Sequence, residues 1–324
     1  MKNKLKIIFI GTPDFAVPAL QALLNDADFE ISAIITQEDK LIGRQQTLTS
    51  TPVKIEALKN GIKVMQPAKI KNLKNEITTL RPDFIIVVAY GQIIPQDILD
   101  IPKYGCINVH ASLLPRWRGA AVIQAPILAG DTETGVTIMK MDKSLDTGPI
   151  IAQMKVNVLK NETAETLHDE LAKLGAQMLP ETLKAFAQGK MELKTQDKNQ
   201  VTYARELKKE DGRINWSKPA IEIERMARAY TPWPGTFGQL QITLPTGRQE
   251  NDKLQIIKIL EVENATLPLN KFKIGEIFLD NKKMAIQCGA GALVVKKLQL
   301  EGGKPLSAED FLRGHADFVG TILK

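Results

Sequence analysis

The sequence is poor in the residues that build covalent or metal-held frameworks. It has two cysteines among 324 residues, Cys106 and Cys288, and no C-x-x-C pair. Disulfide-stabilised secreted domains use many more cysteines, so this count favours a reducing cytoplasm and indicates no disulfide framework. The three histidines, at positions 110, 168 and 315, are scattered and lack the spacing of a zinc site. We therefore expect no metal.

Long apolar runs are missing as well. No stretch approaches the roughly 20 residues that a membrane-spanning helix needs. The N-terminus, MKNKLKIIFIG, places basic residues before an apolar run, but that run is short and leads into Gly-Thr-Pro. It predicts a first strand rather than a signal peptide. With 44% apolar and 25% charged residues, the composition is that of a soluble globular chain, so we expect a cytoplasmic location and no membrane partner.

A glycine-rich dinucleotide motif is also absent. Leu5–Ile10 predicts a buried strand, Gly11 a turn and Ala16–Leu24 a helix, yet no G-x-G-x-x-G follows the strand. The close backbone approach that a pyrophosphate needs is not provided, which argues against an NAD-type cofactor. Phe84–Ala89 is a second near-continuous apolar strand of the kind that is buried on both faces of a parallel sheet. This half of the chain therefore predicts an α/β, Rossmann-like domain with a mostly parallel sheet.

The second half has a different pattern. Residues 190–208 are polar and show no sustained periodicity, so we interpret them as a linker between a domain at 1–189 and a C-terminal domain at 209–324. Short alternating stretches follow, of the kind that form an open barrel of oligonucleotide-binding (OB) type. These stretches are 236–244, 253–262, 275–279, 284–287 and 292–300.

The strongest chemical signal lies at the end of a predicted strand, Cys106–His110. Side chains alternate along a strand, so Asn108 and His110 share one face, and the carboxyl ends of parallel strands are where ligands bind. A predicted hairpin from Gly135 to Val158 carries Asp146 at its tip. An amide donor, a titratable base and a carboxylate together suit the transfer of an acyl group to an amine. A hydrogen-bonded Asn and His that merely terminate a strand give the same local pattern.

The motifs around these residues resemble those of the folate-dependent formyltransferases. They are Asn108-Val-His-Ala-Ser-Leu-Leu-Pro115, followed by Arg118-Gly-Ala-Ala121, and Leu145-Asp-Thr-Gly-Pro-Ile150. Segments at both ends of the chain resemble the members of that family that act on methionyl-tRNA. The resemblance implies transfer of the formyl group of 10-formyltetrahydrofolate to the α-amino group of methionyl initiator tRNA, with Asn108, His110 and Asp146 as catalytic residues.

The resemblance also implies where the folate binds. Ser112, Leu113, Leu114 and Pro115 would contact it directly after the catalytic strand, and Tyr90-Gly91 would line the pteridine pocket. Apolar side chains and backbone amides suit a flat heterocycle. The same leucines would equally serve as a lid on the core, and the Tyr90-Gly91 segment as a plain strand-to-helix turn.

Three basic residues are candidates for contact with tRNA. The net charge of +6 (43 − 37) is compatible with a phosphate-rich partner but specific to none. In the resembled family a basic loop enters the acceptor stem, and Arg44, in the polar stretch 37–52, matches its arginine; Arg205 and Lys304 are further candidates. Only 5% of residues are aromatic, so we expect backbone contacts rather than base stacking. A solvated surface is the alternative for Arg44 and Lys304, and the neighbouring Glu206 argues against a basic track at Arg205.

Two other functions stay open at this point. The same folate chemistry could act on another amine, such as an amino-sugar nucleotide, or on water, because the central motifs are shared across the family. A nucleic-acid-binding adaptor on a catalytically idle scaffold is the third reading, and the intact set of Asn108, His110 and Asp146 argues against it. Nothing in the sequence indicates an obligate interface, so we expect a monomer.

Overall fold

The computed structural model describes residues 4–43, 45–242, 253–265 and 271–324. The chain forms two compact units that interleave along the sequence. The first comprises Met1–Val122, Glu133–Asn157 and Leu167–Arg205; the second comprises Ile123–Thr132, Val158–Thr166 and Glu206–Lys324. The domain and linker boundaries at 1–189, 190–208 and 209–324 stay predictions.

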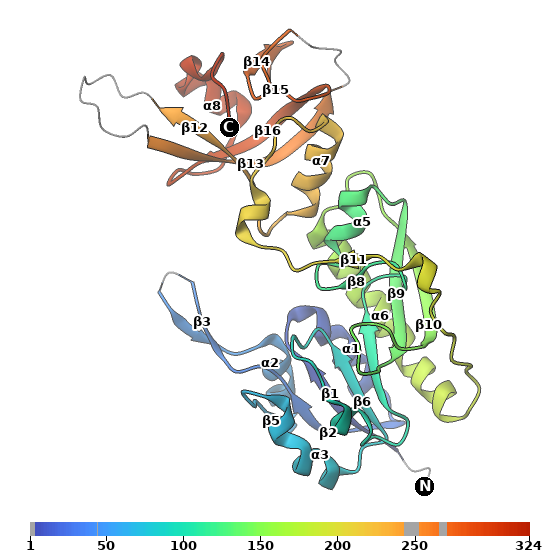
Figure 1. Ribbon diagram of the computed structural model, residues 1–324. Coiled ribbons are helices and arrows are strands. Elements are labelled where there is room, and N and C mark those ends of the chain that lie inside the picture. Colours follow the sequence, from blue (N-terminus) through green and yellow to red (C-terminus); the bar gives the residue numbers. More distant parts are fainter. Residues whose placement is uncertain (1–3, 44, 243–252, 266–270) are drawn as a thin grey trace. The chain divides into compact units, whose positions relative to one another are not determined.

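The first unit is built on a seven-stranded sheet of order β10-β9-β7-β6-β1-β2-β5 (Figure 1). Every pair from β7 to β5 is parallel, whereas β9 runs antiparallel to both β7 and β10. This confirms the predicted α/β class with a mostly parallel sheet. The strands are β1 (Leu5–Gly11), β2 (Phe29–Ile35), β5 (Val64–Met65), β6 (Phe84–Val88), β7 (Cys106–His110), β9 (Glu133–Lys140) and β10 (Ile150–Asn157).

The central strands are buried on both faces. Alternate residues Ile8, Ile10 and Ile85 pack into one apolar cluster, together with residues from the helices on that side. Phe84 leaves the opposite face of β6 and lies near the ring of Phe186 in helix α6 (Ala164–Ala187). Two-sided burial explains why β1 and β6 are almost continuously apolar in sequence.

Helices flank this sheet, and one of them differs from the prediction. The sequence predicts a helical pair split at Pro180, but α6 runs unbroken through that residue. An interior proline costs a helix about 3 kcal/mol. Leu171, Leu179 and Leu183 are buried on either side of it, and burying one such side chain contributes about 1.5–3 kcal/mol. The other helices are α1 (Val17–Leu24), α2 (Pro52–Lys59), α3 (Lys74–Leu80) and α4 (Gln96–Leu99).

The stretch 37–52, expected to be an irregular exposed loop, contains a short hairpin instead. Strands β3 (Lys40–Ile42) and β4 (Thr47–Thr49) pair antiparallel and project from the rest of the unit (Figure 1). Leu41 and Leu48 face each other across the pair and are both exposed. Because Leu41 and Leu48 are not packed on the core, this stretch lacks the apolar alternation that marks a strand with one buried face.

The second unit contains an antiparallel sheet of order β12-β13-β16-β15-β14, with β17 paired to β16. It confirms the predicted C-terminal sheet, while closure into an OB-like barrel stays a prediction. Trp216, Ile257 and Phe311 belong to its core. Its elements are α5 (Gln124–Ala129), α7 (Ala220–Ala229), β12 (Thr236–Ile242), β13 (Lys253–Ala265), β14 (Ile277–Asp280), β15 (Lys283–Gln287), β16 (Ala292–Leu300), β17 (Leu306–Ser307) and α8 (Ala308–Gly314).

Within the part of the chain that the structure describes, no helix is both long enough and apolar enough to cross a bilayer.

Candidate active site

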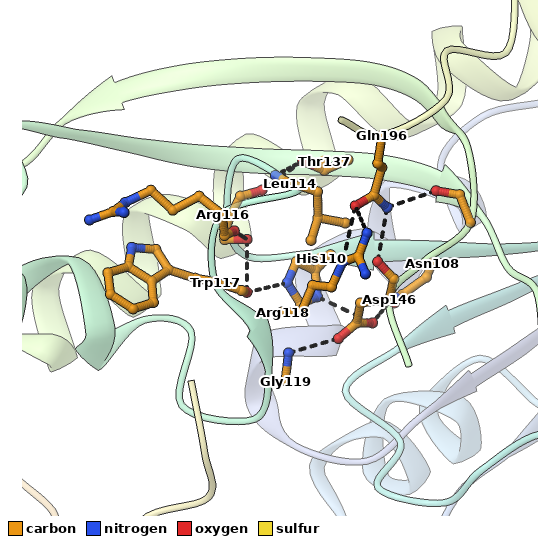
Figure 2. Close-up of polar contacts among 12 residues, drawn as sticks. Asn108, His110, Leu114, Arg116, Trp117, Arg118, Gly119, Thr137, Asp146 and Gln196 are labelled. Atoms are coloured by element: carbon orange, nitrogen blue, oxygen red, sulfur yellow. Dashed lines mark hydrogen bonds and ion pairs between the residues drawn. The ribbon is translucent and has the colours of Figure 1, made fainter. Parts of the chain in front are cut away.

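Strand β7 and the loop after β9 bring the three predicted catalytic residues together (Figure 2). Asn108 and His110 leave the same face of β7, and the β9–β10 loop returns to place Asp146 beside both. Asp146 Oδ1 lies 3.5 Å from Asn108 Nδ2 and 3.7 Å from His110 Nδ1. The side chains of His110 and Asp146 are buried. Residues 38 positions apart in sequence thus form one cluster at the end of a core strand.

The imidazole of His110 is oriented by a backbone carbonyl. Its Nε2 lies 3.0 Å from the carbonyl oxygen of Trp117. A carbonyl oxygen only accepts hydrogen bonds, so Nε2 is the nitrogen that donates. In the neutral ring the lone pair is then on Nδ1, which faces Asp146. Trp117 adopts a φ of 60°, a conformation that bulky residues rarely take, and its carbonyl also accepts from Ser112 Oγ at 3.1 Å.

The carboxylate of Asp146 has its own fixed partners. Oδ2 accepts a 2.9 Å hydrogen bond from the backbone N–H of Gly119. Oδ1 is left to Asn108 and His110. Asp146 itself has a left-handed φ of 54°, a conformation that Asp tolerates better than most residues. The backbone and the hydrogen bond together hold the carboxylate toward the histidine.

Two further residues hold the Asp146 loop, and the sequence analysis assigned neither of them there. Gln196 donates through Nε2 to the carbonyl oxygens of Asp146, at 2.9 Å, and Gly148, at 2.8 Å. Its Oε1 accepts from Arg118 Nε and Nη2, at 3.2 and 2.7 Å. Arg118 is itself buried, and its guanidinium is satisfied here by a neutral amide oxygen and not by a carboxylate of the described residues. Gln196 lies in the polar stretch 190–208 that we interpreted as a linker. The sequence of that stretch shows no hydrophobic periodicity, so no local signal marks Gln196 as part of the site.

The predicted folate segment turns largely inward. Ser112 is buried, and its Oγ donates to the carbonyl of Arg116 at 2.7 Å. The N–H of Leu114 donates to Thr137 Oγ1, and its side chain joins a small buried cluster with Met139 and Ile150. Leu113 and Pro115 are partly exposed. Contact between this segment and a folate stays a prediction.

Tyr90 and Gly91 follow β6, as the prediction requires. The Tyr90 ring packs into the core, its hydroxyl has no hydrogen-bond partner among the described residues, and burial raises its pKa to about 12. The Tyr90 carbonyl accepts from Thr12 Oγ1 and Gln37 Nε2, which ties this turn to neighbouring loops. Any contribution of Tyr90 to a pteridine site would therefore come from its backbone.

The predicted tRNA contacts lie apart from this cluster in sequence. Arg44 falls outside the described residues. Arg205 follows strand β11 (Tyr203–Ala204) at the end of the first unit, and Lys304 lies in the loop after β16 in the second unit; both side chains are exposed. Exposure is compatible with a role in tRNA binding and with a solvated surface alike. Among the residues that the structure describes, no group of three or more His, Cys, Asp or Glu side chains is arranged to hold a metal ion.

Two sequence families match the chain. Residues 5–183 match the formyl transferase family, and residues 206–316 match the formyl transferase C-terminal domain. The chain belongs to the formyl transferase family. Its relatives include proteins named methionyl-tRNA formyltransferase from Geotalea uraniireducens, 44% identical over 98% of both chains, and from Pseudomonas fluorescens, 42% identical over 100% of this chain and 98% of the relative.

Solved structures of formyltransferases share the fold of this family member. The N-formyltransferase from Helicobacter canadensis, described in complex with folinic acid and dTDP-3-aminofucose, matches with a TM-score of 0.64 at 19% identity, covering 90% of this chain and 98% of that one. A sugar 3N-formyl transferase described with dTDP and 5-N-formyl-THF matches with a TM-score of 0.62 at 24% identity, covering 90% and 97%. At these identities the likeness concerns the fold.

Proposed function

We propose that this formyltransferase moves the formyl group of 10-formyltetrahydrofolate to the α-amino group of methionyl initiator tRNA, giving N-formylmethionyl-tRNA for translation initiation. One observation carries the proposal. Relatives named methionyl-tRNA formyltransferase match the chain at 41–44% identity over 96–100% of its length. The sugar formyltransferases match at 19–24% identity. The amino-sugar alternative is therefore disfavoured.

We assign the proton transfers to His110. The attacking amine must lose a proton as its nitrogen bonds to the formyl carbon, and the departing folate nitrogen must gain one as its bond to that carbon breaks. Because Nε2 already donates to the Trp117 carbonyl, Nδ1 is the nitrogen that takes and returns the proton. The amine has to approach on the Nδ1 side of the ring. Asp146, 3.7 Å from Nδ1, stabilises the imidazolium that forms.

Asn108 is assigned to the oxyanion. As the amine adds to the carbonyl carbon, the carbonyl oxygen becomes negative and needs hydrogen-bond donors. The Asn108 amide has two N–H groups, and the long contact to Asp146 Oδ1 uses only one of them. The other is available to the oxygen. The same cluster thus provides a donor, a base and a charge that supports the base.

The substrate-binding roles follow the family. Ser112, Leu113, Leu114 and Pro115 with the backbone of Tyr90 and Gly91 would hold the folate, and Arg44, Arg205 and Lys304 would contact the tRNA backbone. A substrate that exists as charged tRNA implies a cytoplasmic location, and we propose that the chain acts there as a monomer.

The test is a choice among acceptors. The chain is incubated with formyl-labelled 10-formyltetrahydrofolate and, separately, with methionyl initiator tRNA, methionyl elongator tRNA, free methionine or a dTDP-amino sugar. We expect label on the initiator tRNA, far less on the elongator tRNA and none on the small amines. Label on the amino sugar with unlabelled tRNA would overturn the proposal in favour of sugar formylation. Binding of tRNA without any labelled product would overturn it in favour of an adaptor.

A further inference from the structure

The segment that follows α6 is bonded directly to the loops of the active site. Residues 194–204, here called the linker clip, begin with Lys194, whose backbone exchanges two hydrogen bonds with Ile150 at the start of β10. They continue with Gln196 on the carbonyls of Asp146 and Gly148. The linker clip therefore contacts the β9–β10 loop at the backbone of Asp146, at Gly148 and at the start of β10.

The end of the linker clip holds the other loop of the site. Thr202 accepts from the N–H of Trp117 through Oγ1 at 2.9 Å and from the N–H of Arg118 through its carbonyl at 2.9 Å. Strand β8 (Arg118–Gly119) then pairs in parallel with β11. Gly119 lies so close that a β-carbon there would be 2.5 Å from the carbonyl oxygen of Ala204. The loop whose carbonyl orients His110 and whose N–H binds Asp146 is thus fastened to the linker clip.

Gln196 and Arg118 are unusual as a buried pair. Both side chains are about 95% buried, and the guanidinium donates twice to one neutral amide oxygen. The amide then directs both N–H groups at the two loop carbonyls (Figure 2). A buried charge is costly unless its donors are satisfied, so this arrangement fixes the Gln196 amide in one orientation. That orientation is the one that holds the loop of Asp146.

We propose that Gln196 is a positioning residue for the formyl transfer: the linker clip, through Gln196 and its anchor Arg118, fixes Asp146 against His110. The inference rests on the proposed role of Asp146. It assigns a part in the chemistry to a segment that the sequence presents only as a polar connection between domains. Gln196 reaches the reacting groups only through the backbone of the loop.

Two substitutions at Gln196 separate positioning from stability. Gln196→Glu keeps an oxygen for Arg118 and gives the buried guanidinium an anionic partner, but it removes the N–H donors to the two carbonyls. The other carboxylate oxygen would face the carbonyl oxygens of Asp146 and Gly148 and repel the loop, while the ion pair with Arg118 offsets the loss of stability. We expect an unfolding temperature close to that of the unmodified chain and a kcat at least tenfold lower, with KM for the folate and the tRNA changed less than threefold. Gln196→Met removes both functions and should lower kcat similarly, together with the unfolding temperature.

The matched control lies in the same segment. Gln200 is exposed, and its side-chain Nε2 donates to Asp197 Oδ2 at 2.9 Å, so Gln200→Glu makes the same chemical change away from the site. We expect it to leave kcat and both KM values within twofold of the unmodified chain.

A double-mutant comparison tests the route of the effect. If Gln196 acts through Asp146, Gln196→Met should slow a chain that already carries Asp146→Ala by less than threefold. An equal fall in both backgrounds would show a general structural role and overturn the proposal. So would a Gln196→Glu chain of normal kcat. If instead Asp146→Ala alone kept a normal rate, the catalytic assignment of Asp146 would be the part that fails.

Discussion

Replacing Asp146 with asparagine removes a negative charge from the site without changing the size of the side chain. The side chain keeps its shape, and an amide oxygen can still accept from the N–H of Gly119. The amide nitrogen, however, would offer a hydrogen toward Nδ1 of His110, which is the lone pair that we assign to the amine proton. The variant therefore loses the carboxylate that stabilises the imidazolium and partly blocks the base.

The magnitude follows from the distance. A unit charge 3.7 Å from Nδ1 stabilises a protonated ring by about 4 kcal/mol at an effective dielectric constant of about 20. Each 1.36 kcal/mol corresponds to about a tenfold change in rate, so losing all of this electrostatic stabilisation would slow the reaction about a thousandfold. We expect Asp146→Asn to lower the rate of the chemical step by roughly two to three orders of magnitude. The effect is smaller than the full value because the positive charge on His110 is only partly developed at the transition state.

The assay is single-turnover formylation of methionyl initiator tRNA with both substrates saturating, so that binding does not contribute. Asp142→Asn is the control, since Asp142 lies in the same hairpin loop but is exposed. We expect the control to react at a normal rate and Asp146→Asn to bind tRNA normally. An Asp146→Asn rate within threefold of normal would refute the assignment of Asp146 as the group that stabilises protonated His110, because removing a charge at this distance from the catalytic base must change the rate.

Three further predictions concern Asn108, Gly119 and the two cysteines. Asn108→Ala should lower the single-turnover rate about a hundredfold or more through loss of an oxyanion donor, with tRNA affinity unchanged; an equal loss of affinity would point to a binding role instead. Gly119→Ala should lower the free energy of unfolding in urea by about 2 kcal/mol or more, because Gly119 has a φ of +114° and a β-carbon there would strike the carbonyl oxygen of Ala204. Gly189→Ala is the control and should cost less, since Gly189 has a φ of +71° but open space around it. Burial raises the pKa of the Cys106 and Cys288 thiols to about 12, so a thiol-specific reagent at pH 8 should label neither in the native chain and both in denaturant; rapid native labelling would contradict the burial of these groups.

The sequence predicted the architecture of the first unit well because its core strands are buried on both faces. Leu5–Ile10 and Phe84–Ala89 are apolar runs that have few alternative structures in a soluble chain. It predicted the β3–β4 hairpin and the unbroken α6 poorly. In the hairpin the paired side chains of Leu41 and Leu48 face solvent. At Pro180 the packing of leucines on both sides outweighs the low helix propensity of proline. The local hydrophobic pattern therefore fails to predict an element when the contacts that stabilise it are distant in sequence or when its side chains are exposed.

For the site, the sequence by itself determined the chemical groups: an amide and an imidazole on one face of β7, and a carboxylate in a hairpin loop. Alternation along a strand places Asn108 beside His110 whatever the rest of the chain does. Only the tertiary structure decided which nitrogen of His110 faces Asp146, which way the carboxylate of Asp146 points, and that Gln196 and Arg118 bond to the loop that carries it. Those features depend on hydrogen bonds between residues up to 85 positions apart, such as Trp117 and Thr202, and no local periodicity records such contacts.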